Sequence, residues 1–330
     1  MVMIAKKIFM FIFSIYLSIT GTALISPSAD DPIRPSADAN LAFAIIADPQ
    51  VSNYMPERYN YFQASAKDLK NAEGLDALLN AGDVAENGLE MEYSLVAEEL
   101  AGLKLRHIVA EGNHDIRLRV YEQSLSRFNN FINTLNGDES AVSFHHSESI
   151  KGYKFIVLGS DRTEFEENYL SPEQLEWLDK ELASVEEGQP RFVMVHQPLK
   201  NTNGLPKVWN SPIDSAGSIG AQSDELKAIL DKYTNVFLIT GHEHTGFGEY
   251  TYEKVGKNIH SINVPSLCVN NNDGENNDHG LAFVAEVYDG RVLFRARNLC
   301  EGKWLPEFDI DIPLENAAAP VPVRVDYTAV

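Results

Sequence analysis

Five short, strand-like segments of this chain each end in side chains that commonly bind metal ions. The clearest is residues 106–110, which lead directly into Gly112, Asn113, His114 and Asp115. Open α/β sheets bind ligands outside the carboxyl ends of their strands. Five such endings therefore predict a single crevice in which these side chains converge.

The other four segments have the same layout, an apolar run followed by polar side chains. Residues 41–47 are followed by Asp48 and Gln50, and residues 75–81 by Asp83. Residues 191–195 are followed by His196, and residues 235–240 by His242 and His244. With Asn113, they supply carboxylate, amide and imidazole donors, a mixture that suits two divalent cations of intermediate hardness. A lone histidine beside an apolar strand is most often a core residue. Seven candidate ligands at strand ends are not explained in that way.

The order of the expected elements favours an α/β fold. Strands at residues 41–47, 75–81 and 106–110 alternate with helices at residues 57–70 and 92–103, which predicts a largely parallel sheet with helices packed on it. We expect a hairpin around Lys151-Gly152 and further helices at residues 121–135, 171–182 and 223–232. The strands expected at residues 258–264, 281–288, 292–298 and 308–312 predict a second, more antiparallel sheet that faces the first.

The first 23 residues have the features of an export signal. Lys6-Lys7 precede an apolar run at residues 8–19, and the small residues Gly21-Thr22-Ala23 follow it. The alternative is a membrane anchor, but this run is shorter than the roughly 18 residues that a spanning helix needs. We therefore expect a secreted or periplasmic protein without stable membrane insertion. Residues 24–40, rich in Pro, Ser and Asp, predict a linker, residues 41–313 the domain, and residues 314–330 a loose tail.

Composition limits the partners. The 330 residues are 44% hydrophobic, enough for a sizeable core in one large domain or two smaller ones. The formal net charge of −21 would repel long nucleic acid, and most of this acidity is expected on a solvated surface. A positively charged site would have to be made locally by bound metal. The chain has two cysteines, Cys268 and Cys300, which form either one disulfide or two buried free thiols.

Five sequence blocks occur in a recognisable order: Asp-x-Gln, Gly-Asp-x-x-Glu-Asn-Gly, Gly-Asn-His-Asp, His-x-Pro and Gly-His-x-His. Together they resemble the signature of the calcineurin-like metallophosphoesterases, the superfamily of purple acid phosphatases and class III cyclic nucleotide phosphodiesterases. The resemblance spans Asp48 to His244. It implies a four-layer αββα sandwich of two mixed β-sheets flanked by helices.

The resemblance also implies two metal sites. The first would be formed by Asp48, Gln50, Asp83 and His244, and the second by Asp83, Asn113, His196 and His242, with Asp83 bridging both metals. The expected cofactors are two divalent ions, Mn²⁺, Zn²⁺ or Fe. Gln50 stands where many members have His, and an amide oxygen is a harder, weaker donor than imidazole. The first site is therefore expected to favour Mn²⁺.

The chemistry expected of such a centre is hydrolysis of a phosphoester by a hydroxide that bridges the two metals. His114 would stabilise the transition state or protonate the leaving oxygen, with Asp115 fixing the orientation of its ring. The expected substrates are small phosphodiesters or phosphomonoesters, and Arg117 slightly favours the cyclic nucleotide phosphodiesterase branch. The alternative is a non-catalytic binding scaffold that retains the fold.

Two further features have two interpretations each. Glu86 stands where an Asp is common in the second block, and we expect it either beside a metal ligand or at a solvated helix start. Residues 200–221, with Lys200, Asn203 and Trp209, form either a wall of the substrate site or an ordinary surface loop. Residues 270–278 predict a solvated turn, since their acidic residues lack the spacing of a Ca²⁺ loop.

Overall fold

The computed structural model describes residues 31–117, 119–137, 143–270, 272 and 278–317. The export signal expected at residues 1–23 lies outside these residues, as do residues 318–330 of the expected tail and part of the turn at residues 270–278. None of the helices in the described part of the chain combines the length and hydrophobicity that crossing a bilayer requires. Within the expected linker, Ile33 is fully buried in the domain core, so this segment already packs against the domain.

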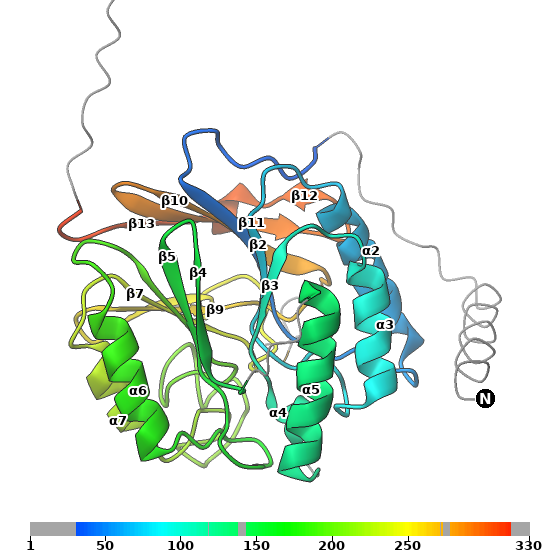
Figure 1. Ribbon diagram of the computed structural model, residues 1–330, viewed down its shortest axis with the longest axis horizontal. Helices are drawn as coiled ribbons and strands as arrows, with labels where there is room; N and C mark the ends of the chain where they lie inside the picture. Colours follow the sequence, from blue (N-terminus) through cyan, green and yellow to red (C-terminus); the bar gives the residue numbers. More distant parts are fainter. Residues whose placement is uncertain (1–30, 118, 138–142, 271, 273–277, 318–330) are drawn as a thin grey trace, which may run out of the picture.

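Two mixed β-sheets form the centre of the molecule (Figure 1). The first has seven strands in the order β12-β11-β10-β1-β2-β3, with β13 also paired to β11, and the second has six in the order β4-β5-β6-β7-β9-β8. The first sheet consists of β1 (Leu41–Ile46), β2 (Ala77–Asn80), β3 (Arg106–Val109), β10 (Leu281–Tyr288), β11 (Arg291–Asn298), β12 (Lys303–Trp304) and β13 (Ile310–Pro313). The second consists of β4 (His146–Ile150), β5 (Tyr153–Val157), β6 (Arg191–Met194), β7 (Val236–Thr240), β8 (Tyr252–Val255) and β9 (Ile259–Asn263).

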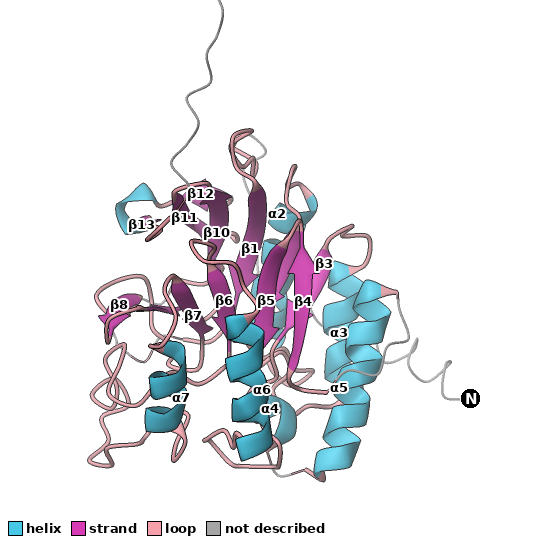
Figure 2. Cartoon of the chain, turned by 60° about the vertical axis from the view of Figure 1, so that its left-hand side comes forward, coloured by secondary structure: helices cyan, strands magenta, loops and turns pink. Residues whose placement is uncertain are grey.

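Helices cover the outer face of each sheet. Helices α2 (Pro56–Lys70), α3 (Glu90–Leu100) and α5 (Tyr121–Asn136) pack on the first sheet, and α6 (Pro172–Ala183) and α7 (Ser223–Leu230) pack on the second. Figure 2 shows the two groups of helices on opposite sides of the paired sheets. The predicted four-layer sandwich is therefore confirmed.

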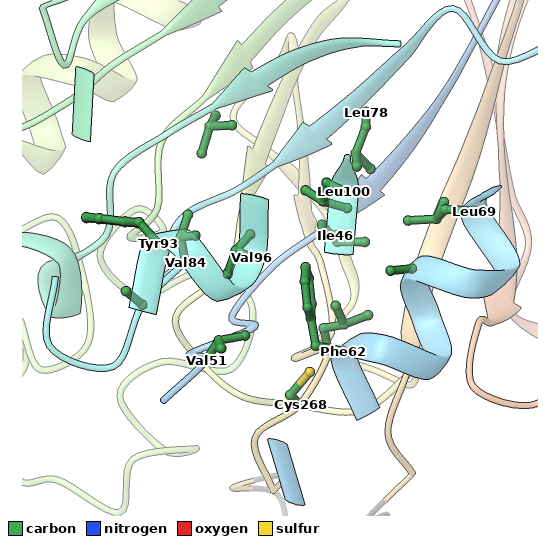
Figure 3. Close-up of a cluster of buried hydrophobic side chains, with 14 of the residues drawn as sticks. Ile46, Val51, Phe62, Leu69, Leu78, Val84, Tyr93, Val96, Leu100 and Cys268 are labelled. Carbon is green, nitrogen blue, oxygen red and sulfur yellow. The ribbon is translucent and has the colours of Figure 1, made fainter. Parts of the chain in front are cut away.

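Strand β1 shows how the sequence builds these layers. Alternate side chains of a strand point to opposite faces of the sheet. Phe43 and Ile45 lie in the core between the two sheets, whereas Ala44 and Ile46 lie in the core beneath the helices. Figure 3 shows Ile46 in this second core, close to Phe62 of α2. A strand that is apolar on both faces must be covered on both faces, which accounts for its unbroken hydrophobic sequence.

The strands of the second half do not form a sheet of their own. Strands β8 and β9 join the second sheet, with β9 parallel to β7, but β10 pairs antiparallel with β1 in the first sheet. The expectation that residues 258–312 form one separate sheet is therefore wrong. An apolar pattern identifies a strand that is buried on both faces, but it does not specify the strand with which its backbone pairs.

Most of the expected elements are present with small shifts at their ends. The antiparallel hairpin β4–β5 turns at Lys151-Gly152 as predicted, with φ angles of 50° and 87°. The structure adds a short helix, α4 (Asn113–Ile116), and a 3₁₀ turn, η1 (Pro306–Phe308), that periodicity did not predict. Helix α4 begins at one of the expected metal ligands, so the backbone turns sharply where strand β3 reaches the site.

Candidate dimetal centre

Two groups of acidic and imidazole side chains meet at the carboxyl ends of strands from both sheets. Asp48, Asp83 and His244 form one group, and Asp83, His196 and His242 form the other. Within each group, the candidate ligand atoms lie within 4.8 Å of one another. Asp83 belongs to both groups, which is the arrangement of a carboxylate shared between two metal ions.

Gln50 also reaches this centre. Its Nε2 donates a hydrogen bond to Oδ2 of Asp83 at 2.8 Å and lies 3.2 Å from Nε2 of His244. Its Oε1 accepts a hydrogen bond from NH1 of Arg58 at 3.2 Å. Coordination of a metal through Oε1 would require the amide to rotate by half a turn, which would bring Nε2 close to Arg58.

Asn113 presents an oxygen atom that has no hydrogen-bond partner within the described structure. Its Nδ2 donates to Oε2 of Glu166 at 2.7 Å, so Oδ1 is on the other side of the amide. This Oδ1 is buried and has no hydrogen-bond partner among the described residues. An unpaired buried acceptor costs about 1–3 kcal/mol, which a bound cation would offset. The carboxylate, amide and imidazole atoms present therefore fit two divalent cations.

The backbone is strained at five of the seven predicted ligands. The φ angles of Asp48, Gln50, Asp83, His242 and His244 are 52°, 38°, 51°, 72° and 50°. Such left-handed conformations are uncommon for residues other than glycine and cost of order 1–3 kcal/mol each. Strain of this kind clusters at functional sites, where the surrounding structure holds it in place.

Glycines allow the ligand loops to approach one another closely. A Cβ atom at Gly112 would lie 2.1 Å from Oδ1 of Asp83, and one at Gly82 would lie 2.6 Å from Nδ1 of His196. Gly82 also has a φ of 103°, which favours glycine. The two glycines in the second and third sequence blocks therefore make room for the shared carboxylate and the imidazole beside it.

The charges of the centre attract a cation. Burial alone would raise the pKa of Asp83, but His196 and His114 hold it well below its usual value. Burial would lower the pKa of His196, but Asp83 and Asp48 together raise it to about 10. Burial and the nearby His196 lower the pKa of His242. The two carboxylates thus stabilise positive charge at the point where the two groups of ligands meet.

His114 lies beside the centre. Its Nε2 is 3.9 Å from Oδ2 of Asp83, while its Nδ1 is 2.9 Å from the carbonyl oxygen of Glu86 and 2.9 Å from NH2 of Arg117. Nδ1 can donate to Glu86 or accept from Arg117, but not both at once, because one ring nitrogen carries either a proton or a lone pair. The backbone of Glu86 thus contacts the ring of His114, and the Glu86 carboxylate pairs with Arg58 at 2.5 Å.

A family model described as calcineurin-like phosphoesterase matches residues 41–246, more than half of the chain. This chain belongs to that family. The match includes all seven of the predicted ligands and His114, so the resemblance drawn from the five sequence blocks is confirmed.

Curated relatives and solved structures agree with the family. The chain is 29% identical to a 3′,5′-cyclic-nucleotide phosphodiesterase of Nostoc, over 59% of this chain and 63% of the relative. It is 25% identical to a 3′,5′-cyclic adenosine monophosphate phosphodiesterase of Escherichia coli, over 59% of this chain and 62% of that relative. The chain thus spans less than two thirds of the length of these relatives. A dimetal phosphatase structure from Danio rerio shares the fold with a TM-score of 0.62 at 16% identity, covering 84% of this chain and 100% of that one.

Asp115 of this calcineurin-like chain does not orient His114. Its buried carboxylate accepts hydrogen bonds from the backbone N–H groups of Val84, Ala85 and Gly112 and from the hydroxyl of Tyr93. The expectation that Asp115 fixes the ring of His114 is therefore wrong, because the start of α4 turns the two side chains away from each other. Burial and the charge of Asp83 raise the pKa of Asp115 to about 7. Asp115 instead joins the segment that follows Asp83 to the segment that precedes Asn113, by accepting from the backbone of both.

The loop of residues 200–221 contributes one side chain to the centre. The ring of Trp209 lies 4.8 Å from the ring of His242, between centroids. Lys200 instead pairs with exposed Asp214, and Asn203 is buried and donates to the carbonyl oxygen of Tyr250. Trp209 thus supports the interpretation of this loop as a wall of the site, whereas Lys200 pairs within the loop and Asn203 joins the loop to the segment before β8.

Three residues near the centre were missed or only noted by sequence reasoning. Arg58 contacts Gln50 and Glu86, and Glu166 contacts Asn113 and Arg117. Arg117 was noted only as a family hint. Arg58 is in the first turn of α2, eight residues after Gln50, so its proximity could have been anticipated. Nothing in the sequence around Glu166 separates it from the neighbouring loop acids.

The two cysteines are free thiols. Cys268 and Cys300 are both buried, and Sγ of Cys300 lies 3.4 Å from the carbonyl oxygen of Tyr61. Burial raises the pKa of the Cys300 thiol to about 11. Of the two alternatives open from the sequence, the structure shows buried thiols.

Proposed function

We propose that this protein is an exported hydrolase that cleaves small phosphoesters with two divalent metal ions. The observation that carries the proposal is that Asp83 belongs to both groups of ligands while His114 lies beside them. A structural metal site would have no need of an additional imidazole that faces the shared carboxylate. The sequence features of residues 1–23 support export.

The proposed ligands create positive charge on a negatively charged protein. Two divalent ions against the carboxylates of Asp48 and Asp83 leave a local surplus of about two positive charges. This surplus suits a phosphate group despite the net charge of −21. When bound, two such ions activate water as a nucleophile and stabilise the phosphoryl oxygens. Once the amide of Gln50 is turned so that Oε1 faces the first site, this hard oxygen would favour Mn²⁺ there, with Zn²⁺ or Fe as the alternatives.

His114 is the proposed proton donor to the leaving oxygen. When Nδ1 accepts the hydrogen bond from Arg117, a neutral ring carries its proton on Nε2, the nitrogen nearer to Asp83. When Nδ1 instead donates to the carbonyl oxygen of Glu86, neutral Nε2 is an acceptor. The contact with Arg117 therefore favours the form of the ring that can protonate a leaving group.

The substrates proposed are small phosphodiesters, with phosphomonoesters as the alternative. The curated relatives support diesters, since both are described as cyclic nucleotide phosphodiesterases. A small substrate is consistent with Trp209 close to the centre, because this ring narrows the space beside His242.

The test is hydrolysis of bis(p-nitrophenyl) phosphate, p-nitrophenyl phosphate and cyclic AMP. Purified protein would be stripped of metal with a chelator and then supplied with Mn²⁺ or Zn²⁺. We expect turnover only after metal is added, faster with the diesters than with the monoester. A preference for the monoester would assign the protein as a phosphatase. No turnover of any of these esters by protein shown to hold two metal ions would overturn the proposal and favour the non-catalytic scaffold.

A further inference from the structure

Glu166 connects the two halves of the centre. It lies in the loop of residues 158–171, between strand β5 and helix α6, and thus belongs to the half of the molecule built on the second sheet. Its carboxylate contacts Asn113 and Arg117, which follow strand β3 of the first sheet. No sequence block of the family includes this loop, so Glu166 has no role assigned by the motifs.

One oxygen of Glu166 determines which way the amide of Asn113 faces. An asparagine side chain has a donor end and an acceptor end, and turning it over exchanges the two. Nδ2 of Asn113 donates to Oε2 of Glu166 at 2.7 Å, a short bond to a charged acceptor. The carboxylate cannot donate to Oδ1, so the reversed amide would lose this bond. The buried, unpaired Oδ1 is therefore held on the side away from Glu166.

The other oxygen of Glu166 holds Arg117. NH1 of Arg117 donates to Oε1 of Glu166 at 3.1 Å, while NH2 of the same guanidinium lies 2.9 Å from Nδ1 of His114. A guanidinium is a planar fork, so fixing one nitrogen restricts the position of the other. The contact of Arg117 with His114 thus depends on where Glu166 places the guanidinium.

Glu166 is itself held in place by the second sheet. Its backbone carbonyl accepts a hydrogen bond from Nε2 of Gln197 at 3.0 Å, and Gln197 directly follows the ligand His196. Oε1 of Gln197 in turn accepts from Nδ2 of Asn168 at 3.2 Å. An exposed ion pair on a mobile loop would contribute little. The backbone contact of Glu166 with Gln197 and the buried amide contact behind it instead fix the Glu166 loop relative to the centre.

We propose that Glu166 is a positioning residue that aims Oδ1 of Asn113 at the second metal and holds Arg117 against His114. The inference rests on the proposed dimetal function. It predicts that loss of Glu166 weakens metal binding at one site and not at the other. Residues that orient metal ligands typically change metal affinity by about 10- to 100-fold when they are replaced.

The test compares Glu166→Ala and Glu166→Gln with Glu164→Gln, a matched change in the same loop. Glu164 pairs with Arg162 at 2.6 Å and contacts none of the proposed ligands in the described structure. Mn²⁺ binding would be measured by titration calorimetry and bound metal by mass spectrometry. We expect two sites of wild-type affinity in Glu164→Gln, and one site weakened by about 10- to 100-fold in Glu166→Ala. Glu166→Gln should be intermediate, since its single acceptor oxygen can serve Asn113 or Arg117 but not both.

A second variant separates the two contacts of Glu166. Arg117→Ala should retain both metal sites but reduce kcat, because the Arg117 guanidinium contacts His114 and, within the described structure, none of the proposed metal ligands. Wild-type affinity at both sites in Glu166→Ala would overturn the proposal. If that variant does not fold, wild-type affinity at both sites in Glu166→Leu, whose side chain offers Asn113 no acceptor, would overturn it instead. Metal binding is measured without substrate, so a protein that binds two ions and hydrolyses nothing would disprove the proposed function and leave this inference standing.

Discussion

Nε2 of His196 lies 3.2 Å from Oδ2 of Asp83, across the junction of the two sheets. Asp83 follows β2 of the first sheet, and His196 follows β6 of the second. The candidate centre is therefore complete only when the two sheets have packed face to face. Phenylalanines pack between the two sheets, such as Phe43 against Phe192 with ring centroids 5.2 Å apart, and help to hold the sheets together.

Asp83→Asn should remove both metal ions, whereas His244→Ala should remove one. The reason is that Asp83 belongs to both groups of ligands and His244 to the first alone. Bound metal would be counted by mass spectrometry after dialysis against buffered Mn²⁺. In the same buffer, metal at about 100 times its dissociation constant should stabilise the wild type by about 2.7 kcal/mol per site. Retention of one tightly bound ion in Asp83→Asn would show that the carboxylate is not shared.

His114→Ala should reduce turnover by about 10²- to 10⁴-fold without loss of metal. The ring lies beside the shared carboxylate but belongs to neither group of ligands. Steady-state kinetics with bis(p-nitrophenyl) phosphate, combined with metal analysis, would separate the two effects. An ester with a better leaving group should be affected less, because its leaving oxygen needs less help from a proton donor. Equal activity in the variant would rule out the proposed role.

Asp115→Ala should destabilise the fold by at least about 2 kcal/mol, measured by urea denaturation at pH 8. Three backbone N–H groups and the Tyr93 hydroxyl would lose their acceptor, and each buried donor left unpaired costs about 1–3 kcal/mol. Tyr93→Phe is the milder comparison, since it removes one of the four donors. A variant of normal stability that lacks activity would instead support a direct catalytic role for Asp115.

Trp209→Ala should lower kcat/KM by about three- to tenfold, because aromatic contacts of this kind contribute about 0.5–1.5 kcal/mol. The indole packs against the ring of His242, with 4.8 Å between centroids. Lys200→Ala is the control from the same loop, since its exposed ion pair with Asp214 should contribute little. Equal kcat/KM in the two variants would assign residues 200–221 to an ordinary surface loop.

The pH dependence of stability should reveal His107, a buried residue of β3. Burial, with a smaller effect of the Arg106 charge, lowers the pKa of His107 to about 4. In the unfolded chain, its pKa is about 6.5. Below that pH, His107 takes up a proton in the unfolded state but not in the folded state. The contribution of neutral His107 to the free energy of unfolding is therefore complete above pH 6.5 and is lost as the pH falls towards 4.

His107→Leu tests this loss. Between pH 7.5 and pH 5, the wild type should lose about 2 kcal/mol more than the variant in urea denaturation with a chelator present. The metal-site histidines titrate in both proteins, so the difference between the two isolates His107. Identical pH profiles would mean that His107 is protonated in the folded protein as readily as in the unfolded chain.

Local patterns in the sequence determined the elements and the ligand types. The apolar strands and the helix that begins at Ser171, whose side chain accepts from the N–H of Gln174, could be predicted without a structure. They depend on contacts within a few residues or on a chemical preference of the side chain itself. The shared position of Asp83 was implied by the family resemblance, and the structure places Asp83 in both groups.

Long-range pairing and side-chain direction were decided only by the tertiary structure. Strand β10 completes the first sheet although its sequence equally suited the second, and Asp115 turns away from His114 although the two residues are adjacent. Glu166 reaches Asn113 across 53 residues of sequence. Each of these contacts depends on how two sheets and their loops pack together, and a one-dimensional pattern does not encode that arrangement. The sequence by itself therefore determined which residues are candidate metal ligands, and the packing of the two sheets decided which of them meet and what orients them.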